Sequence, residues 1–293
     1  MAYEIPDHFY LSFTRNVELL LQQRNSRFAP AVMQSSYGGK AAQVVKQFGE
    51  VEFQEVTTRN GDTNFSEIDH KQRWVFPTDY DLALPVDRED ELRMLDSPVS
   101  PYAEAMRAAW ARRMDATIVA AFFANAQVGV NGASTEAFDS NMEVGTNVGG
   151  TASGLNIEKL IAARELLMET EALQDGEEAF IGVSSKQLGN LLNEEKVTNS
   201  DYATIKALVR GDIDSYMGFK FIRYEGLPYE STNLRNCPVW VKSGMHLGQW
   251  GGFFTRIDQR PDKRYLTQVF MAGTIGATRT QEGKVAQIQC TET

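Results

Sequence analysis

The 293-residue sequence predicts an α+β protein that is extended near its start, helical in its middle and extended again at its end. Three observations support this prediction. Residues 41–90 contain two extended runs around a polar turn, residues 101–125 carry apolar side chains at helical spacing, and residues 251–293 return to strand-like runs. Between them, residues 151–250 alternate helical and strand patterns, which is typical of an α/β unit.

The first forty residues are interpreted as an N-terminal arm with one amphipathic helix. The apolar face of that helix consists of Phe13, Val17, Leu20 and Leu21. A helix of about a dozen residues is marginally stable alone in water, so this face must pack on another surface. That surface belongs either to the same chain or to a neighbouring subunit, and both interpretations stay open.

Residues 41–90 are interpreted as a long hairpin with a polar tip. Val51 and Phe53 alternate with polar residues, which predicts a half-buried strand. Asn60-Gly61 is a strong turn signal, and residues 73–76 (RWVF) predict the returning strand. A two-stranded hairpin is at best marginally stable, so it must lie on its own domain or on a neighbour.

Residues 91–150 contain the strongest helix signal, which covers residues 101–125. Ser100 followed by Pro101 predicts an N-cap and the first helical residue. Apolar side chains then recur every four residues: Tyr102, Met106, Trp110, Met114, Ile118 and Phe122. This helix is expected to be the internal backbone on which a domain is built.

In residues 151–250 we expect helices at 157–173, 184–192 and 201–209, with strands at 179–183, 217–222 and 239–241. Ser184 and Gln187 form a capping-box pattern at the second of these helices. The last part of the chain predicts four return strands. They cover residues 253–257, 265–271, 274–280 and 285–290.

Residues with catalytic or metal-binding chemistry are sparse, so neither a catalytic site nor a cofactor or metal is expected. The three histidines, His8, His70 and His246, lie more than sixty residues apart in sequence, which excludes short zinc-binding motifs. The densest acidic cluster is more simply a solvated or salt-bridged surface. It consists of Asp79, Asp81, Asp87 and Asp90. Cys237 and Cys290 are expected to be reduced thiols packed as small apolar groups.

Charge and hydropathy indicate a protein of the cytoplasm that does not grip nucleic acid. The net charge is −10, whereas a protein that binds phosphates needs a basic face. No run is apolar and long enough for a transmembrane helix, and the first residues do not form a secretory signal. Such a chain is suited to enclosing DNA rather than clamping it.

The order of these elements resembles the Hong Kong-type capsid fold of tailed-bacteriophage major capsid proteins. Several segments resemble one branch of that family, including a helix that contains Arg113 and Asp115. The other segments are residues 5–9 (IPDHF), 73–81 (RWVFPTDYD), 97–102 (SPVSPY), 196–202 (KVTNSDY), 211–221 (GDIDSYMGFKF) and 226–228 (GLP). The resemblance implies an N-arm (1–40), an E-loop (41–90), a peripheral domain with a spine helix (91–150 and 251–293) and an axial domain (151–250).

The resemblance further implies a shell subunit of the virion that assembles with itself, as hexamers and pentamers, around double-stranded DNA. The chain begins almost directly with the arm, so a separate scaffolding protein or self-sufficient assembly is expected, together with a portal and no covalent cross-link. The residues assigned to subunit interfaces come from the arm and the hairpin. They are Phe13, Val17, Leu20, Leu21, Val51, Phe53, Arg59, Asp62, Arg73 and Trp74.

Two alternatives stay open. An encapsulin-type compartment has the same fold but carries a cargo enzyme instead of DNA. A soluble cytoplasmic enzyme with its site in the α/β unit belongs to another class, and a pocket with convergent polar groups would support it.

Overall fold

A computed structural model of the chain describes residues 22–49, 51–53, 55, 59, 65–86, 99–174, 176–193 and 215–292. Its α-helices are α2 (Val99–Phe123), α3 (Ile157–Glu169) and α4 (Ser185–Leu192). The first strands are β1 (Met33–Tyr37), β2 (Ala42–Phe48), β3 (His70–Val75), β4 (Thr78–Val86), β5 (Ala126–Val128), β6 (Ser134–Glu136) and β7 (Glu143–Val144). The later strands are β8 (Ala179–Val183), β9 (Ser215–Tyr216), β10 (Phe219–Arg223), β11 (Tyr229–Ser231), β12 (Leu234–Val241), β13 (Met245–Arg260), β14 (Leu266–Arg279) and β15 (Val285–Thr291). Short 3-10 turns include η1 (Ala29–Ala31), η2 (Ser140–Met142) and η5 (Pro261–Lys263).

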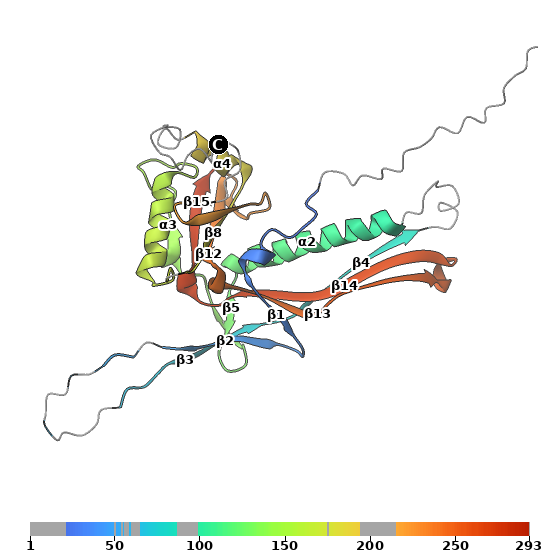
Figure 1. Ribbon diagram of the computed structural model, residues 1–293, viewed down its shortest axis with the longest axis horizontal. Coiled ribbons are helices and arrows are strands. Elements are labelled where there is room, and N and C mark those ends of the chain that lie inside the picture. The colour runs from blue at the N-terminus through green and yellow to red at the C-terminus, as the bar shows by residue number, and fades with distance from the viewer. Residues whose placement is uncertain are drawn as a thin grey trace, which may run out of the picture.

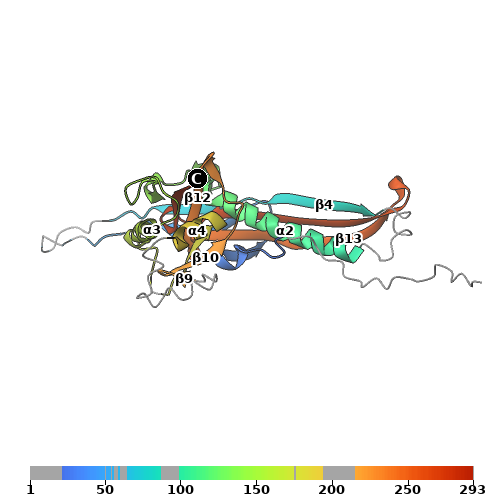
Figure 2. The same cartoon turned by 90° about the horizontal axis from the view of Figure 1, so that it is seen from above.

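The described strands form three sheets that point in different directions. One has the order β1-β13-β14-β4, a second the order β7-β15-β12-β8-β10-β9 with β11 on β12, and a third the order β2-β3-β5-β6. Figure 1 shows the β13–β14 arm and α2 extending to one side, while the β2–β3 hairpin extends to the other. The view from above in Figure 2 shows the same opposition of the two ends along an elongated molecule.

Helix α2 lies along the first sheet because its apolar stripe meets that sheet's covered face. Met106 packs against Val269 and Met271 of β14, and all three side chains are buried. Trp110 rests over Gly273, where a Cβ atom would collide with the indole ring. Glycine at this position therefore allows the helix to approach the strand closely.

The main core joins the end of α2 to the seven-stranded sheet through an aromatic cluster. Trp240 on β12 is completely buried, and its ring centroid lies 4.7 Å from that of Phe122 and 5.6 Å from that of Phe28. Its Nε1 donates a hydrogen bond of 2.9 Å to the carbonyl oxygen of Ala31. The segment before β1, the spine helix and the α/β unit therefore share one packed interior.

Several local predictions are confirmed. The predicted long helix is α2, which begins at Val99 and ends at Phe123. Ser184 and Gln187 form the capping box at the start of α4. Both cysteines are free and buried. The predicted helix at 201–209 lies outside the described residues. Within the part of the chain that the structure describes, no helix has the length and apolarity to cross a membrane.

Three strand predictions are wrong. Residues 51–53 are exposed and belong to no strand, because no other described segment of the chain pairs with them. The runs at 265–271 and 274–280 form one strand, β14, since β13 pairs with residues 266–279 apart from one bulge and β4 pairs across both runs with residues 267–275. β15 lies between β7 and β12 in the seven-stranded sheet rather than with the return strands.

The hairpin is also shorter than the expected range of residues 41–90. β4 leaves the hairpin and pairs antiparallel with β14 in the spine-helix sheet. Period-2 alternation predicts that a segment is a strand and which face is buried, but it does not identify the partner strand. Sheet membership is therefore the part of the prediction that failed.

Replacing Trp240 with alanine is expected to lower the free energy of unfolding by about 3–5 kcal/mol, because it removes a large buried ring that three elements share. Chemical denaturation of the unassembled subunit measures this change. The exposed aromatic Tyr265 serves as the control. Its replacement with alanine should change stability by less than about 0.5 kcal/mol, and equal losses for the two variants would contradict the proposed core.

Candidate assembly surfaces

Asp115 attaches the N-terminal segment to the middle of α2. Its carboxylate is completely buried and accepts hydrogen bonds from the backbone N–H of Arg27, at 2.9 Å, and of Phe28, at 3.2 Å. The hydroxyl of Ser26 donates at 2.5 Å, and the side-chain amide of Gln23 donates as well. A buried carboxylate is tolerated only with such partners, so this set fixes where the chain crosses the helix.

Arg279 closes the C-terminal end of α2. Its completely buried guanidinium donates to the carbonyl oxygens of Phe122, at 2.7 Å, and Ala124, which are left without helical partners at the C-terminus. Its Nε also lies 2.9 Å from a carboxylate oxygen of Glu282. Burial lowers the pKa of Arg279 while the charge of Glu282 raises it, and the guanidinium stays protonated.

Glu282 links this helix end to the base of the hairpin. Arg73 on β3 lies 3.2 Å from Glu282 and 2.7 Å from Glu136 on β6. The Arg73 side chain is 3% exposed and lies in the interior of the subunit, and its predicted interface contact stays a prediction. Its neighbour Trp74 is half-buried and donates from Nε1 to the carbonyl oxygen of Gly129 at 2.7 Å.

Beyond this fixed base, the hairpin exposes large apolar side chains. Val51 is 47% exposed, and Phe53 and Phe65 are exposed almost completely. Large aromatic side chains in full contact with water are unfavourable in a monomer and typically mark an interaction site. Arg59 is exposed nearby. The remaining predicted interface residues lie outside the described residues: Phe13, Val17, Leu20, Leu21 and Asp62.

A second apolar surface, which the sequence prediction missed, lies on the outer half of β13. Phe253, Phe254 and Ile257 are each about half exposed, at 49%, 55% and 50%. Because side chains alternate across a strand, Phe253 and Phe254 point to opposite faces. Apolar residues on both faces are typical of a strand covered on both sides, and that departure from alternation is the signal that sequence analysis could have used.

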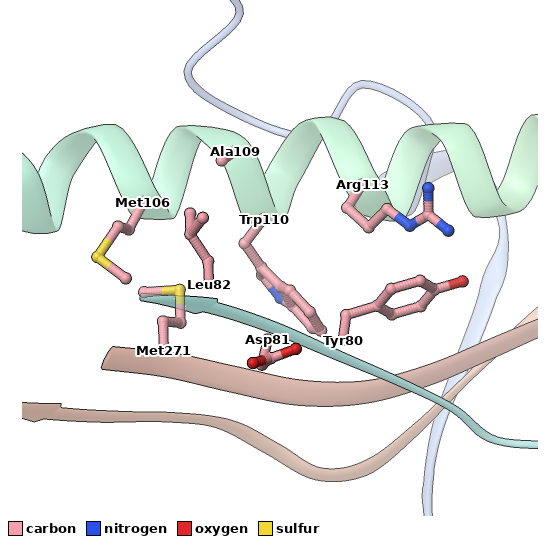
Figure 3. A pocket seen from close by; sticks show the side chains of 8 residues that line it. All are labelled: Tyr80, Asp81, Leu82, Met106, Ala109, Trp110, Arg113 and Met271. Carbon is pink, nitrogen blue, oxygen red and sulfur yellow. The ribbon is translucent and has the colours of Figure 1, made fainter. Parts of the chain in front are cut away.

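A groove of about 410 Å³ lies between α2 and the sheet (Figure 3). Met106 and Trp110 reach down from the helix toward the sheet, while Arg113 runs along the helix above Tyr80. The guanidinium of Arg113 lies 4.0 Å from the centre of the Tyr80 ring, a cation–π contact at one end of the groove. Apart from Asp81 and Arg113, the residues that line the groove are apolar or aromatic. They are Tyr80, Leu82, Met106, Ala109, Trp110 and Met271.

The acidic and thiol groups singled out in the sequence lie in structural positions. Asp79 on β4 accepts a hydrogen bond of 2.6 Å from the hydroxyl of Thr274, while Asp87 and Asp90 lie outside the described residues. Across the described ranges, no group of three or more potential metal ligands gathers. The Sγ atoms of Cys237 and Cys290 are 4.0 Å apart, and their contact together with burial raises the pKa of Cys237 well above its ordinary value.

Glu292 holds the end of the described chain against α4. Its carboxylate accepts hydrogen bonds of 2.7 Å from the side chain of Gln187 and 2.8 Å from the hydroxyl of Tyr229. Arg235 lies 2.7 Å away, and both side chains of this ion pair are buried. Burial alone would raise the pKa of Glu292, but these hydrogen bonds and the charge of Arg235 hold it below its ordinary value.

Comparison with known proteins identifies the family. The sequence profile described as phage capsid protein matches residues 5–292. The chain belongs to the phage capsid protein family. Nothing in the search of curated proteins matches it. Among solved structures, the capsid of cyanophage P-SCSP1u aligns with a TM-score of 0.72 and 13% identity, covering 98% of this chain and 94% of the other.

Two further structures support the same fold. The capsid of Ralstonia phage GP4 covers 98% of its own chain and 100% of this one, with a TM-score of 0.72 and 9% identity. A chain from Mycobacterium phage Che8 aligns with a TM-score of 0.69 and 12% identity, and the alignment covers 96% of this chain and 97% of that one. At such identities the likeness establishes the fold, while the family match establishes this phage capsid protein as a shell-forming structural subunit. The predicted α+β capsid fold is confirmed.

Replacing Asp115 with asparagine in this capsid protein should lower the free energy of unfolding by about 1–3 kcal/mol, because buried N–H donors lose a charged acceptor. Chemical denaturation measures this change. Limited proteolysis should also cut residues 22–32 faster in the variant. The exposed Glu169 on α3 provides a control, and its replacement with glutamine should leave both measurements unchanged. Unchanged proteolysis of the Asp115 variant would show that other contacts hold the segment.

Stability should fall on acidification, first through His246. Burial lowers the pKa of His246 from 6.5 to about 4, while its Nε2 lies 2.9 Å from the hydroxyl of Tyr37. As the pH falls, the unfolded chain therefore binds this proton before the folded chain does. The stability that is fully present above pH 6.5 decreases progressively until the pH reaches the folded pKa of about 4.

Between pH 7 and pH 5 this loss should be on the order of 1–2 kcal/mol. It should be absent in His246→Gln, which cannot titrate but can still contact Tyr37. The lowered pKa of Glu292 adds a further loss below its unfolded value of 4.5 in both proteins. Denaturation curves at the two pH values measure the difference, and equal pH dependence in wild type and variant would contradict the assignment.

Proposed function

We propose that copies of this chain assemble as hexamers and pentamers into a closed icosahedral shell around double-stranded phage DNA. The observation that carries the proposal is the family match over residues 5–292. It is supported by a subunit that leaves apolar side chains exposed at both of its ends. Such a subunit is complete only when neighbours cover those side chains. The driving force is the burial of apolar surface, which contributes about 25 cal/mol per Å². This contribution is repeated at each interface, and a standard interface buries about 1,600 Å² in total.

The hairpin is the proposed clamp between subunits. Its base is held by the ion pairs of Arg73, while Val51 and Phe53 are exposed further out. A fixed base determines the direction of the outer segment, so a neighbour meets it in a defined position. The arm residues and Trp74 remain proposed contacts. In the proposed division of the chain, the hairpin spans residues 42–75, and β15 belongs to the axial domain.

The net charge of −10 suits a container. DNA packed at high density must slide past the wall, and a neutral to acidic inner surface retains few phosphates. We therefore propose that DNA is enclosed without sequence-specific binding and that assembly occurs in the host cytoplasm with a scaffolding protein and a portal. In this role the chain needs neither a catalytic site nor a cofactor. An encapsulin-type compartment would differ in carrying a cargo enzyme.

Sedimentation of the purified protein, with negative-stain images of the fast fraction, tests the proposal. Closed shells, or rings of five or six subunits, are expected either alone or after co-expression with the phage scaffolding protein. A chain that stays monomeric or dimeric under both conditions would overturn it. Shells that contain a cellular enzyme instead of DNA would favour the compartment.

Deleting residues 58–66 should leave a folded, soluble subunit that does not close shells, because the outer part of the hairpin contributes nothing to the described core. Circular dichroism and thermal unfolding verify the fold, and sedimentation measures assembly. A replacement of residues 58–66 by a glycine-serine segment of equal length separates hairpin length from side-chain contacts. Normal shells from the deletion variant would show that the hairpin is not the clamp.

A further inference from the structure

Two cysteines on neighbouring strands lie side by side in the seven-stranded sheet. Cys237 on β12 lies opposite Ile288, and Cys290 on β15 lies opposite Arg235. Residues directly opposite each other point to the same face of an antiparallel pair, and so do residues two apart in one strand. Cys237 and Cys290 are therefore diagonal neighbours on one face, and their Sγ atoms are 4.0 Å apart. The fold thus brings together two buried thiols that are 53 positions apart in the sequence.

This pair lies close to the arrangement that a disulfide bond requires. An S–S bond is about 2.05 Å long, which is about half of the present separation. Each cysteine has a single side-chain torsion, χ1, whose rotation moves the sulfur atom without moving the strand. Pro238, next to Cys237, has no N–H to donate to a neighbouring strand, so the ladder lacks a donor beside the pair. Side-chain rotation and a small local shift can close the remaining distance.

The pair also lies near an edge of its sheet, where a small oxidant can enter. β7 pairs with β15 only as far as Ile288. Past Ile288, β12 is the only strand that pairs with β15 among the described residues. The backbone N–H of Thr291 donates to the carbonyl oxygen of Ser153 at 3.1 Å. A strand end with one strand partner opens locally more readily than the centre of a sheet, and such opening exposes the sulfur atoms.

A buried cation lies near both sulfur atoms. Lys159 on α3 is completely buried, and its Nζ donates to the carbonyl oxygens of Ser153, at 2.7 Å, and Gln289, at 2.9 Å. Burial lowers the pKa of Lys159, whereas the neighbouring Cys290 and Cys237 raise it. A positive charge beside a thiol favours the thiolate, which is the form that reacts with oxidants. The charge of Lys159 therefore offsets part of the burial that keeps these thiols protonated.

We propose that Cys237 and Cys290 are a modification site, at which a small peroxide such as hydrogen peroxide joins the two thiols as a disulfide within one subunit. One thiolate attacks a peroxide oxygen, the O–O bond breaks, and the hydroxide that leaves takes up a proton to become water. The second thiol attacks the sulfur of the resulting sulfenic acid, the S–O bond breaks, and a second water leaves. In total the two thiols lose two electrons and two protons, and the peroxide is reduced to two water molecules.

The bond acts on particles that have left the host cell. A reducing cytosol keeps the thiols free while the chain folds and assembles, whereas the medium outside the cell is oxidising. The disulfide closes a loop that contains all of β13 and β14, so it restricts the unfolded chain and stabilises the folded one. This role, the hardening of released particles, rests on the proposed function, while the bond itself needs only one subunit.

Thiol counting tests the bond. The purified protein is kept in reductant, then freed of it, treated with hydrogen peroxide, unfolded and labelled with a polyethylene-glycol maleimide. The reduced chain should take two labels, one on each of its cysteines. The oxidised chain should take none, be two hydrogens lighter by intact mass, and recover both labels after dithiothreitol. Retention of both labels, a mass gain of oxygen atoms at the cysteines, or a disulfide-linked dimer on a non-reducing gel would overturn the proposal.

Thermal unfolding measures what the bond does to stability. Oxidation of the wild-type subunit should raise Tm by about 5–10 °C, and dithiothreitol should reverse the rise. Cys237→Ala and Cys290→Ala each retain one thiol, and neither should show a rise. Each variant is compared with itself before and after oxidation, so a lower starting stability does not affect the result. An equal rise in either variant would assign the effect to another oxidised side chain and overturn the proposal.

The outcomes separate this inference from the proposed function. A chain that forms the disulfide but never assembles overturns the proposed function and leaves the modification site intact. Assembled particles whose thiols both stay reduced in peroxide overturn only the modification site. In particles that form the bond, release of DNA on heating should need a higher temperature than in the same particles kept in reductant. Equal release temperatures would overturn the hardening role.

Discussion

Two fully buried charges, Asp115 on the spine helix and Arg279 at its C-terminal end, determine how the rest of the subunit is arranged. The carboxylate of Asp115 needs the backbone donors of residues 27–28, and the guanidinium of Arg279 needs the last carbonyl oxygens of α2. Removing either charge from water is costly unless every partner is in place. The N-terminal segment, the helix and the end of β14 therefore form one unit, and the aromatic cluster around Trp240 packs against it.

This unit divides the subunit into a fixed interior and two uncovered ends. Glu282 connects the end of α2 to Arg73, so the base of the hairpin is held by the same charges that hold the helix. The outer hairpin and the outer half of β13 lie beyond these contacts, and the described residues leave their phenylalanine side chains fully or about half exposed. In the proposed assembly, stability and assembly thus depend on different residues, which would allow a subunit to fold before it meets a neighbour.

Much of this fold could be predicted from local patterns, and the failures share one cause. The four-residue spacing of apolar side chains predicts α2, and the Ser184–Gln187 pattern predicts the start of α4, because both depend on residues close in sequence. The partner of β4 and the sheet of β15 depend on pairing between distant segments, which alternation does not specify. Among candidate interface residues, Val51 and Phe53 were chosen from an alternation that predicts a half-buried strand, whereas the structure shows them exposed, and their contact with a neighbour stays a proposal. The ion pair of Arg73 with Glu136 could not be predicted, because a charged residue in a strand gives no indication of a carboxylate distant in sequence.

The exposed hairpin has a further consequence for the subunit before it assembles. A segment with uncovered phenylalanines and free backbone groups is prone to form disordered aggregates, particularly when newly made chains are concentrated. In this chain, glutamates interrupt or flank those apolar residues, as in the sequence from Val51 to Glu55. Like charges on separate copies repel when two hairpins approach each other. In the proposed assembly, the acidic side chains would act as gatekeepers that disfavour contacts between two hairpins and so limit disordered aggregation.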